Sequence, residues 1–97
     1  MTRPTVEATR IVWARRASIQ LEKAKDDIAR QAPFAVAPYI DRVLELVEEL
    51  GRYPDIGRVV PEYENSRIRE RIFGKDRIIY TVEEDSLRIL ALIHDAQ

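Results

Sequence analysis

Arginines recur at every second position in one short stretch of this sequence. Arg67, Arg69 and Arg71 form the repeat, and Arg77 follows after a short turn. Residues two apart share one face of an extended strand, so the repeat predicts three guanidinium groups side by side. Guanidinium groups bind phosphate through paired hydrogen bonds and can stabilise an anionic transition state. Because like charges this close lower stability, the stripe predicts either surface carboxylates beside it or an external partner of opposite charge.

Two residues near this stripe could exchange protons. Glu62 follows Pro61 in the segment that leads to the arginines, and a carboxylate there could accept a proton from a hydroxyl group. His94 ends the last apolar run of the chain, and a histidine there could donate a proton to a leaving group. A plain loop carboxylate and a hydrogen-bonded structural histidine are the simpler interpretations, and the residues alone leave both alternatives open.

Length and composition limit the class of protein. A chain of 97 residues with 45% apolar side chains predicts one globular domain over residues 1–97. No apolar run approaches the roughly 18 residues of a membrane-spanning helix, and the N-terminus lacks the apolar segment of a secretory signal. We therefore expect a cytoplasmic protein that does not bind a membrane. The absence of cysteine and the single histidine leave few ligands for zinc, so we expect neither a metal nor a cofactor.

Positive charge is concentrated in one region although the net charge is −1. Residues 52–80 carry seven Arg or Lys against five Asp or Glu, whereas residues 34–51 and 81–97 each carry one against four. Arg58 and Lys75 belong to this region together with the arginine stripe. The local excess predicts a binding surface there, which the net charge alone would not indicate.

Hydrophobic periodicity predicts the elements that must position these side chains. Residues 10–13 are predicted to form a first strand, and apolar residues three or four apart predict helices over 15–31 and 36–50. Pro33 separates the two helices, and Gly51 is expected to end the second. Their apolar stripes have similar lengths, so an antiparallel helix hairpin is predicted.

The period then changes from 3.6 to 2, which is typical of strands. Residues 67–73 and 77–82 are predicted to form a β-hairpin, and the nearly continuous apolar run 87–93 predicts a central strand. The order β-α-α-β-β-β predicts an α+β fold in which the helix hairpin packs on a small, mostly antiparallel sheet.

The same periodicity predicts which residues form the core. Ile68 and Ile72 are expected to face the helices. The sequence leaves the register of the β-hairpin open, and a phosphate-binding site would require Arg69 and Arg77 on the same solvent-facing side of the sheet. The predicted core consists of Ala17, Leu21, Ala24, Ile28, Val36, Ile40, Val43, Val47 and Leu50 from the helices and Ile72, Ile78, Tyr80, Ile89 and Ala91 from the strands.

An ordered set of residues runs from about residue 10 to the end of the chain. It consists of Trp13 and Ala17, Leu50 followed by Pro54-x-x-Gly57-Arg58, Pro61-Glu62, Ile68-Arg69-Glu70, Arg77-Ile-x-Tyr80, and an apolar strand that ends at His94. This order and spacing resemble the RelE/ParE superfamily of toxins from bacterial and archaeal type II toxin–antitoxin modules. The resemblance implies a growth-arresting toxin, often linked to plasmid stabilization, that a cognate antitoxin holds inactive in a hetero-oligomer.

RelE-like members of this superfamily are endoribonucleases that cleave messenger RNA in the ribosomal A site without a metal. For this chain the resemblance then implies a general base, two groups that stabilise the phosphate and a general acid, which are Glu62, Arg69, Arg77 and His94 respectively. It also implies contacts to RNA or to another target from Arg58, Arg67, Arg71, Lys75 and Tyr80. We take this ribonuclease as the main expectation.

Two alternatives stay open. ParE-like members poison DNA gyrase without cleaving anything themselves, and a degenerate module would retain only antitoxin binding or autoregulation. Gln97 stands where many superfamily members have the arginine of a His-x-x-Arg motif, and the chain lacks the clear positive charge usual in ribosome-targeting toxins. In each case an antitoxin segment is expected to add a strand or lay a helix on the toxin, and the arginine stripe predicts that part of this segment is acidic.

Overall fold

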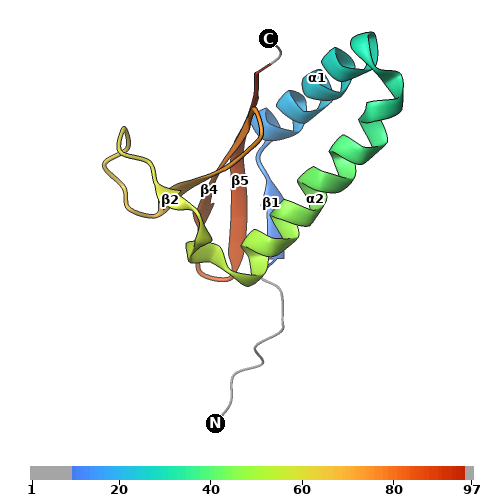
Figure 1. Ribbon diagram of the computed structural model, residues 1–97. Helices are drawn as coiled ribbons and strands as arrows, with labels where there is room; N and C mark the ends of the chain where they lie inside the picture. The colour runs from blue at the N-terminus through green and yellow to red at the C-terminus, as the bar shows by residue number, and fades with distance from the viewer. Residues whose placement is uncertain (1–9, 96–97) are drawn as a thin grey trace.

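The computed structural model describes residues 10–95, and its α-helices and strands follow the predicted order with one added strand (Figure 1). The helix hairpin consists of α1 (Arg15–Gln31) and α2 (Val36–Arg52), with a short 3-10 turn at Pro33–Ala35 between them. The predicted strands are β1 (Arg10–Trp13), β3 (Ile68–Phe73), β4 (Asp76–Val82) and β5 (Ser86–His94). The addition is a two-residue strand, β2 (Arg58–Val59), within the segment expected to be a loop.

The strands form one mixed sheet in the order β1-β5-β4-β3-β2. β1 is parallel to β5, and the other neighbouring strands are antiparallel. A parallel pair needs a long crossover connection, and the helix hairpin begins that connection directly after β1. Both helices lie on the same face of the sheet (Figure 1), so the predicted α+β fold is confirmed.

The core lies between the helix hairpin and the central strands. Most of the predicted helix and strand residues are buried, and Leu46, Leu87 and Leu92 join them. The buried core cluster consists of Ala17, Ala24, Val43, Leu46, Val47, Leu50, Ile78, Tyr80, Leu87, Ile89 and Leu92. Leu21 packs against this core and is partly buried. Ile28, Val36 and Ile40 are also only partly buried.

The register between β3 and β4 reverses the expected orientation of two arginines. Arg69 lies opposite Tyr80, and Arg71 lies opposite Ile78. Directly paired residues point to the same side of a sheet, and Tyr80 and Ile78 belong to the core. Both arginines therefore project toward the helices and not toward solvent.

The opposite face of β3 carries the isoleucines that were expected in the core. Ile72 pairs with Arg77 and is 50% exposed, and Ile68 pairs with Thr81 on the same side. We call this side, which carries Ile72 and Arg77 and faces away from the helices, the uncovered face. The prediction that Ile68 and Ile72 face the helices is wrong, and Arg69 and Arg77 do not share a side as a phosphate-binding site would require.

A β-bulge in β5 determines where His94 points. Ile79 and Tyr80 are neighbours in β4, but their partners in β5, Ala91 and Ile89, are two residues apart. The extra residue changes the alternation of side chains along the rest of β5. Ala91 is consequently buried on the uncovered face beside Ile79, and His94 turns toward the helix hairpin.

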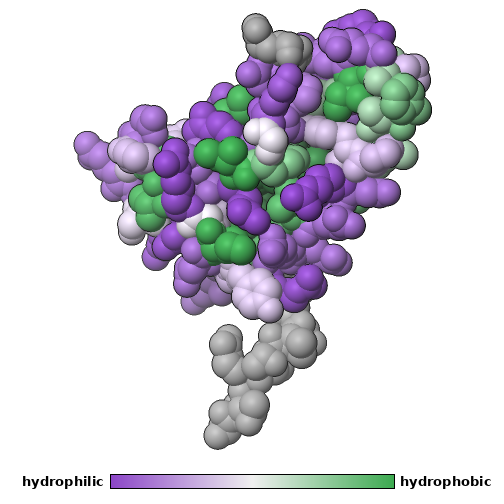
Figure 2. Space-filling view, viewed as in Figure 1, coloured by the Kyte–Doolittle hydropathy of each residue, from purple (hydrophilic) through white to green (hydrophobic). Residues whose placement is uncertain are grey.

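One face of the molecule is mostly polar. Figure 2 shows this largely hydrophilic face, on which hydrophobic side chains form several separate patches over both the sheet side and the helix hairpin. Within residues 10–95, no helix is both long enough and apolar enough to cross a membrane.

Candidate functional site

The arginine stripe has partners inside the molecule. Arg69 Nη1 donates a hydrogen bond to the Gly57 carbonyl oxygen at 2.6 Å. Arg71 Nη2 lies 3.4 Å from Glu49 Oε1 of α2 in a partly buried ion pair. Arg67 is exposed and precedes β3. The stripe therefore does not form the continuous row of solvent-facing guanidinium groups that the sequence predicts.

Tyr80 joins the turn after α2 to the sheet. Its hydroxyl donates to the Pro54 carbonyl oxygen at 2.7 Å and accepts from the Gly57 N–H at 2.9 Å. The side chain is fully buried, and this burial raises the pKa of the Tyr80 phenol. Together with Arg69, these contacts hold the Pro-x-x-Gly turn in position. Tyr80, predicted to contact a target, is thus a core residue with a structural role.

Glu70 is the centre of a buried ion triad on the uncovered face. Its side chain accepts from Arg58 Nε at 2.6 Å and from Arg77 Nε at 2.9 Å, and the residue is only 2% exposed. Burial raises the pKa of the Glu70 carboxyl, but hydrogen bonds and charge from Arg77 and Arg58 lower it by more, so the net pKa lies below its ordinary value. Arg58, expected to contact RNA or another target, and Arg77, expected to stabilise the phosphate, therefore both neutralise an internal carboxylate.

Because of this triad, the free energy of unfolding should fall when the pH becomes acidic. A carboxyl with a lowered folded-state pKa adds stability above its unfolded pKa of about 4.5, and that stability is lost as pH falls through the folded value. We expect Glu70→Gln to lower the free energy of unfolding by about 2 kcal/mol at pH 7. The difference from wild type should shrink in urea titrations as the pH falls below about 4.5. A difference that stays constant over this range would contradict the ionised triad.

Glu62 and His94 lie near opposite ends of the β3–β4 hairpin. Glu62 is exposed in the loop before β3, which extends away from the helices (Figure 1). His94 pairs with Asp76 at the turn end of the hairpin, beyond the far end of β3. Since β3 has six residues, its ends are roughly 15–20 Å apart. The predicted base and acid are not brought together.

His94 is held by an acid from β4 and an aromatic ring from α2. Its Nδ1 lies 2.7 Å from Oδ1 of Asp76, which is buried, and its ring meets the Tyr39 ring edge-on at a centroid distance of 5.6 Å. Burial and the nearby Asp76 carboxylate raise the pKa of the Tyr39 phenol. Through these contacts His94 joins the end of the sheet to α2 of the helix hairpin.

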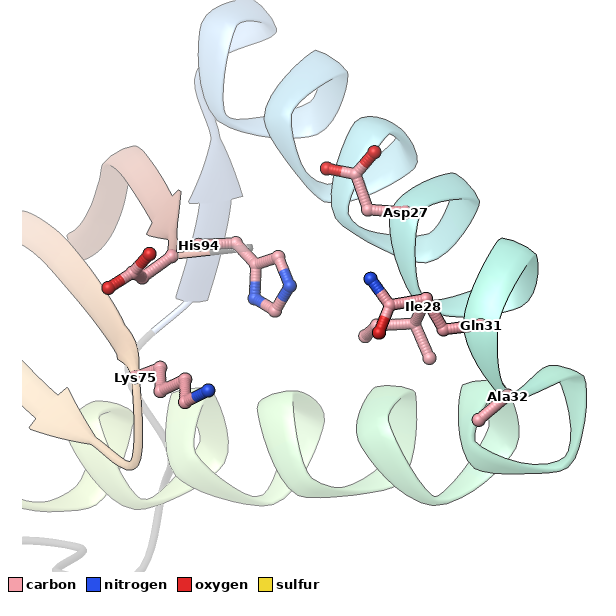
Figure 3. A pocket seen from close by; sticks show the side chains of 7 residues that line it. Asp27, Ile28, Gln31, Ala32, Lys75 and His94 are labelled. Carbon is pink, nitrogen blue, oxygen red and sulfur yellow. The ribbon is translucent and has the colours of Figure 1, made fainter. Parts of the chain in front are cut away.

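His94 also borders a small cleft between α1 and the sheet. The cleft has a volume of about 190 Å³, and Ile28, Gln31 and Lys75 are among the residues that line it. In Figure 3 the imidazole projects from β5 toward Ile28 and Gln31 of α1. Of the residues predicted to contact RNA or another target, Lys75 lines the same cleft as His94. Among residues 10–95, no three His, Cys, Asp or Glu side chains are grouped so that they could hold a metal ion.

Glu70 was quoted from the sequence only as part of the Ile68-Arg69-Glu70 segment and was given no role, and Asp76 was not singled out. Local spacing offers no signal for Glu70, because its immediate neighbours in β3 point to the other face. Its partners come from β2 and β4 instead. Asp76 lies in a predicted turn, where an aspartate is common for reasons of backbone geometry alone.

Comparisons with known proteins agree with this architecture. Residues 11–97 match the family model described as the ParE toxin of the type II toxin–antitoxin system parDE. The fold is similar to a chain of the chromosomal ParDE system from P. aeruginosa, with a TM-score of 0.74, 18% identity, and 90% of this chain and 96% of that chain covered. It is also similar to a chain of the toxin–antitoxin complex RelBE2 from Mycobacterium tuberculosis, with a TM-score of 0.65, 19% identity, and 93% and 94% covered.

A search of curated protein sequences finds no significant match. The two solved structures share less than a fifth of their residues with this chain, so they support the fold. The family match spans nearly the whole sequence and supports membership directly. This protein therefore belongs to the ParE toxin family of type II toxin–antitoxin systems, within the RelE/ParE superfamily.

Proposed function

We propose that this toxin arrests growth by binding DNA gyrase, and that a cognate antitoxin holds it inactive in a hetero-oligomer. The observation that carries the proposal is the separation of the four residues expected to cleave RNA. Glu62 and His94 lie near opposite ends of the β3–β4 hairpin, and Arg69 and Arg77 project from opposite faces of the sheet. Membership of the ParE family supports the same target, since the resemblance to ParE implies gyrase.

Cleavage of a phosphodiester by general acid–base catalysis needs a compact arrangement. The base and the acid must each come within hydrogen-bond distance of oxygens on the same phosphorus, with cationic groups between them. Arg69 already donates to the Gly57 carbonyl oxygen and Arg77 to the Glu70 carboxylate, so a phosphate would have to displace these contacts. A target-binding toxin needs no such convergence, because its surface acts by complementarity alone.

A messenger RNA endoribonuclease is the second candidate, and one observation favours it. A buried carboxylate, Asp76, fixes the orientation of the His94 imidazole, as carboxylates do for many acid–base histidines. In this alternative the ribosome would supply the groups that the chain does not bring near His94.

The order in which synthesis stops distinguishes the two candidates. After induction in a bacterial host, we expect incorporation of labelled thymidine to fall before that of labelled methionine. The purified toxin should also inhibit supercoiling by purified gyrase. An early fall in methionine incorporation with fragmented messenger RNA would instead support the ribonuclease.

Substitution of the proposed base provides an independent check. We expect Glu62→Gln to keep toxicity within about twofold of wild type, because Glu62 is exposed and its side chain forms no hydrogen bond or ion pair with the other residues of 10–95. Loss of a general base would reduce cleavage by about 100-fold or more. Toxicity is read from colony counts at matched expression. We expect a smaller reading frame beside the toxin gene to encode the antitoxin, and its co-expression should restore growth.

A further inference from the structure

An apolar groove lies between α2 and the edge strand β1, away from the residues discussed above. It has a volume of about 490 Å³. Ile11 and Trp13 of β1 and Leu44 and Val47 of α2 provide its apolar walls. Leu44 is 50% exposed, which is high for a leucine in an amphipathic helix. The groove can therefore bury apolar side chains of another molecule.

Three carboxylates border this groove. Asp41, Glu45 and Glu48 line it from α2, and the spacing i, i+4, i+7 puts them along one side of the helix. All three are exposed, and none forms an ion pair with another residue in the 10–95 range. The lining contains no lysine or arginine. The groove thus combines apolar walls with uncompensated negative charge.

The strand at this groove has one edge without a strand partner in the described structure. β1 is the first strand in the sheet order and pairs only with β5. Backbone N–H and C=O groups on such an edge can pair with an added strand. An extended segment lying along β1 could therefore make backbone hydrogen bonds and insert side chains beside Leu44.

We propose that this α2–β1 groove binds a segment of the antitoxin in which apolar side chains are flanked by lysine or arginine. The proposal rests on the antitoxin partner of the proposed function and adds the chemistry of its contact. It differs from the acidic segment that the arginine stripe suggested. That suggestion has less support in the described residues, because Arg69, Arg71 and Arg77 already have internal partners and Arg67 is the exposed member of the repeat.

A second copy of this chain is a poorer occupant. In a two-fold symmetric dimer the same patch meets itself, so Asp41, Glu45 and Glu48 would face their own copies. Like charges placed opposite one another are destabilising. A segment with lysine or arginine is instead attracted to each carboxylate that it approaches, which favours binding.

Crosslinking from the groove identifies its occupant. A photoreactive phenylalanine analogue at position 44 should be tolerated because Leu44 is half exposed. In the complex with the protein encoded beside the toxin gene, we expect the crosslinked peptide to contain more Lys and Arg than Asp and Glu. A crosslink to an acidic peptide, a crosslink to a second toxin chain, or no crosslink in an intact complex would overturn the proposal.

Charge neutralisation measures the contribution of the rim. We expect the triple variant Asp41→Asn, Glu45→Gln, Glu48→Gln to weaken antitoxin binding about tenfold and to reduce its salt dependence. A control variant removes the same charge from exposed acids elsewhere, with the changes Asp26→Asn, Glu84→Gln and Asp85→Asn. The affinity of this control variant for the antitoxin should stay within twofold of that of the wild-type toxin. Thermal unfolding of both variants should confirm that they fold.

The outcomes separate this proposal from the proposed function. If the wild-type complex forms and both triple variants bind equally well, the groove assignment is wrong while the antitoxin partner stands. If wild-type toxin binds no product of the neighbouring reading frame, the antitoxin partner itself fails, and the groove assignment fails with it.

Discussion

Replacing Gly57 with alanine should destabilise the protein by about 3 kcal/mol or more, because the turn after α2 has no room for a methyl group. A Cβ atom at this position would meet the Tyr80 hydroxyl and would lie 2.7 Å from the Glu70 carbonyl oxygen. Neither atom can move cheaply. Tyr80 is fully buried and bonded to Pro54, and the carbonyl belongs to the sheet. Urea unfolding followed by circular dichroism measures the loss.

Gly74 supplies the matched control for this substitution. It has a positive φ of 56° but open space around the position of a Cβ atom. Gly74→Ala should therefore cost only the strain of a left-handed backbone, about 1–2 kcal/mol. Equal losses for the two substitutions would show that the contact between Gly57 and Tyr80 does not decide the packing of this turn.

Reversing the charge of Glu70 should cost at least about 4 kcal/mol and could prevent folding altogether. Lysine there would bury an unpaired cation and leave it between Arg58 and Arg77. The two arginines are partly exposed and can turn toward solvent, but the introduced ammonium group starts from a buried position. Circular dichroism and the soluble yield of Glu70→Lys report the outcome.

Glu49→Lys makes the same charge change in a more open ion pair. Glu49 and Arg71 are each about one third exposed and 3.4 Å apart. Solvent screens such a pair, so this control should lose about 1 kcal/mol or less. If Glu70→Lys folds as well as Glu49→Lys, the triad contributes little to the fold.

The triad also changes how an arginine substitution should be interpreted. Arg77→Ala removes one of the two cations that compensate Glu70, so it alters folding as well as any surface. A loss of toxicity in that variant would not by itself identify a contact with the target. Its free energy of unfolding must be measured beside its toxicity.

Several elements of this fold could be predicted from the sequence because they depend on local periodicity. The predicted apolar stripes of the two helices, which pass through Ala17 and Val43, are confirmed, since both residues are fully buried. The hairpin turn around Gly74 and the continuous apolar run of β5 were also identified. The two-residue strand β2 was missed because a run this short has no period to detect.

The candidate site was less predictable because alternation along a strand does not tell which face is covered. In β3 the apolar and charged residues alternate, and we expected Ile72 on the helix side. A shift of one residue in register exchanges the two faces. On the helix side Arg69 donates to the carbonyl oxygen of Gly57, and the Tyr80 hydroxyl accepts from the N–H of the same glycine. Both Gly57 and Tyr80 lie far from Arg69 in sequence.

The sequence by itself determined the order of elements, the α+β class and the ParE-like family resemblance, because each depends on patterns within one segment or on the order of segments along the chain. Only the tertiary structure decided that Arg69 and Arg77 lie on opposite faces, that Glu70 neutralises Arg58 and Arg77, and that Glu62 is remote from His94. These arrangements depend on strand register, on the bulge in β5 and on contacts between distant segments. Such pairings are set by the packing of the whole sheet, so spacing along the chain cannot specify them.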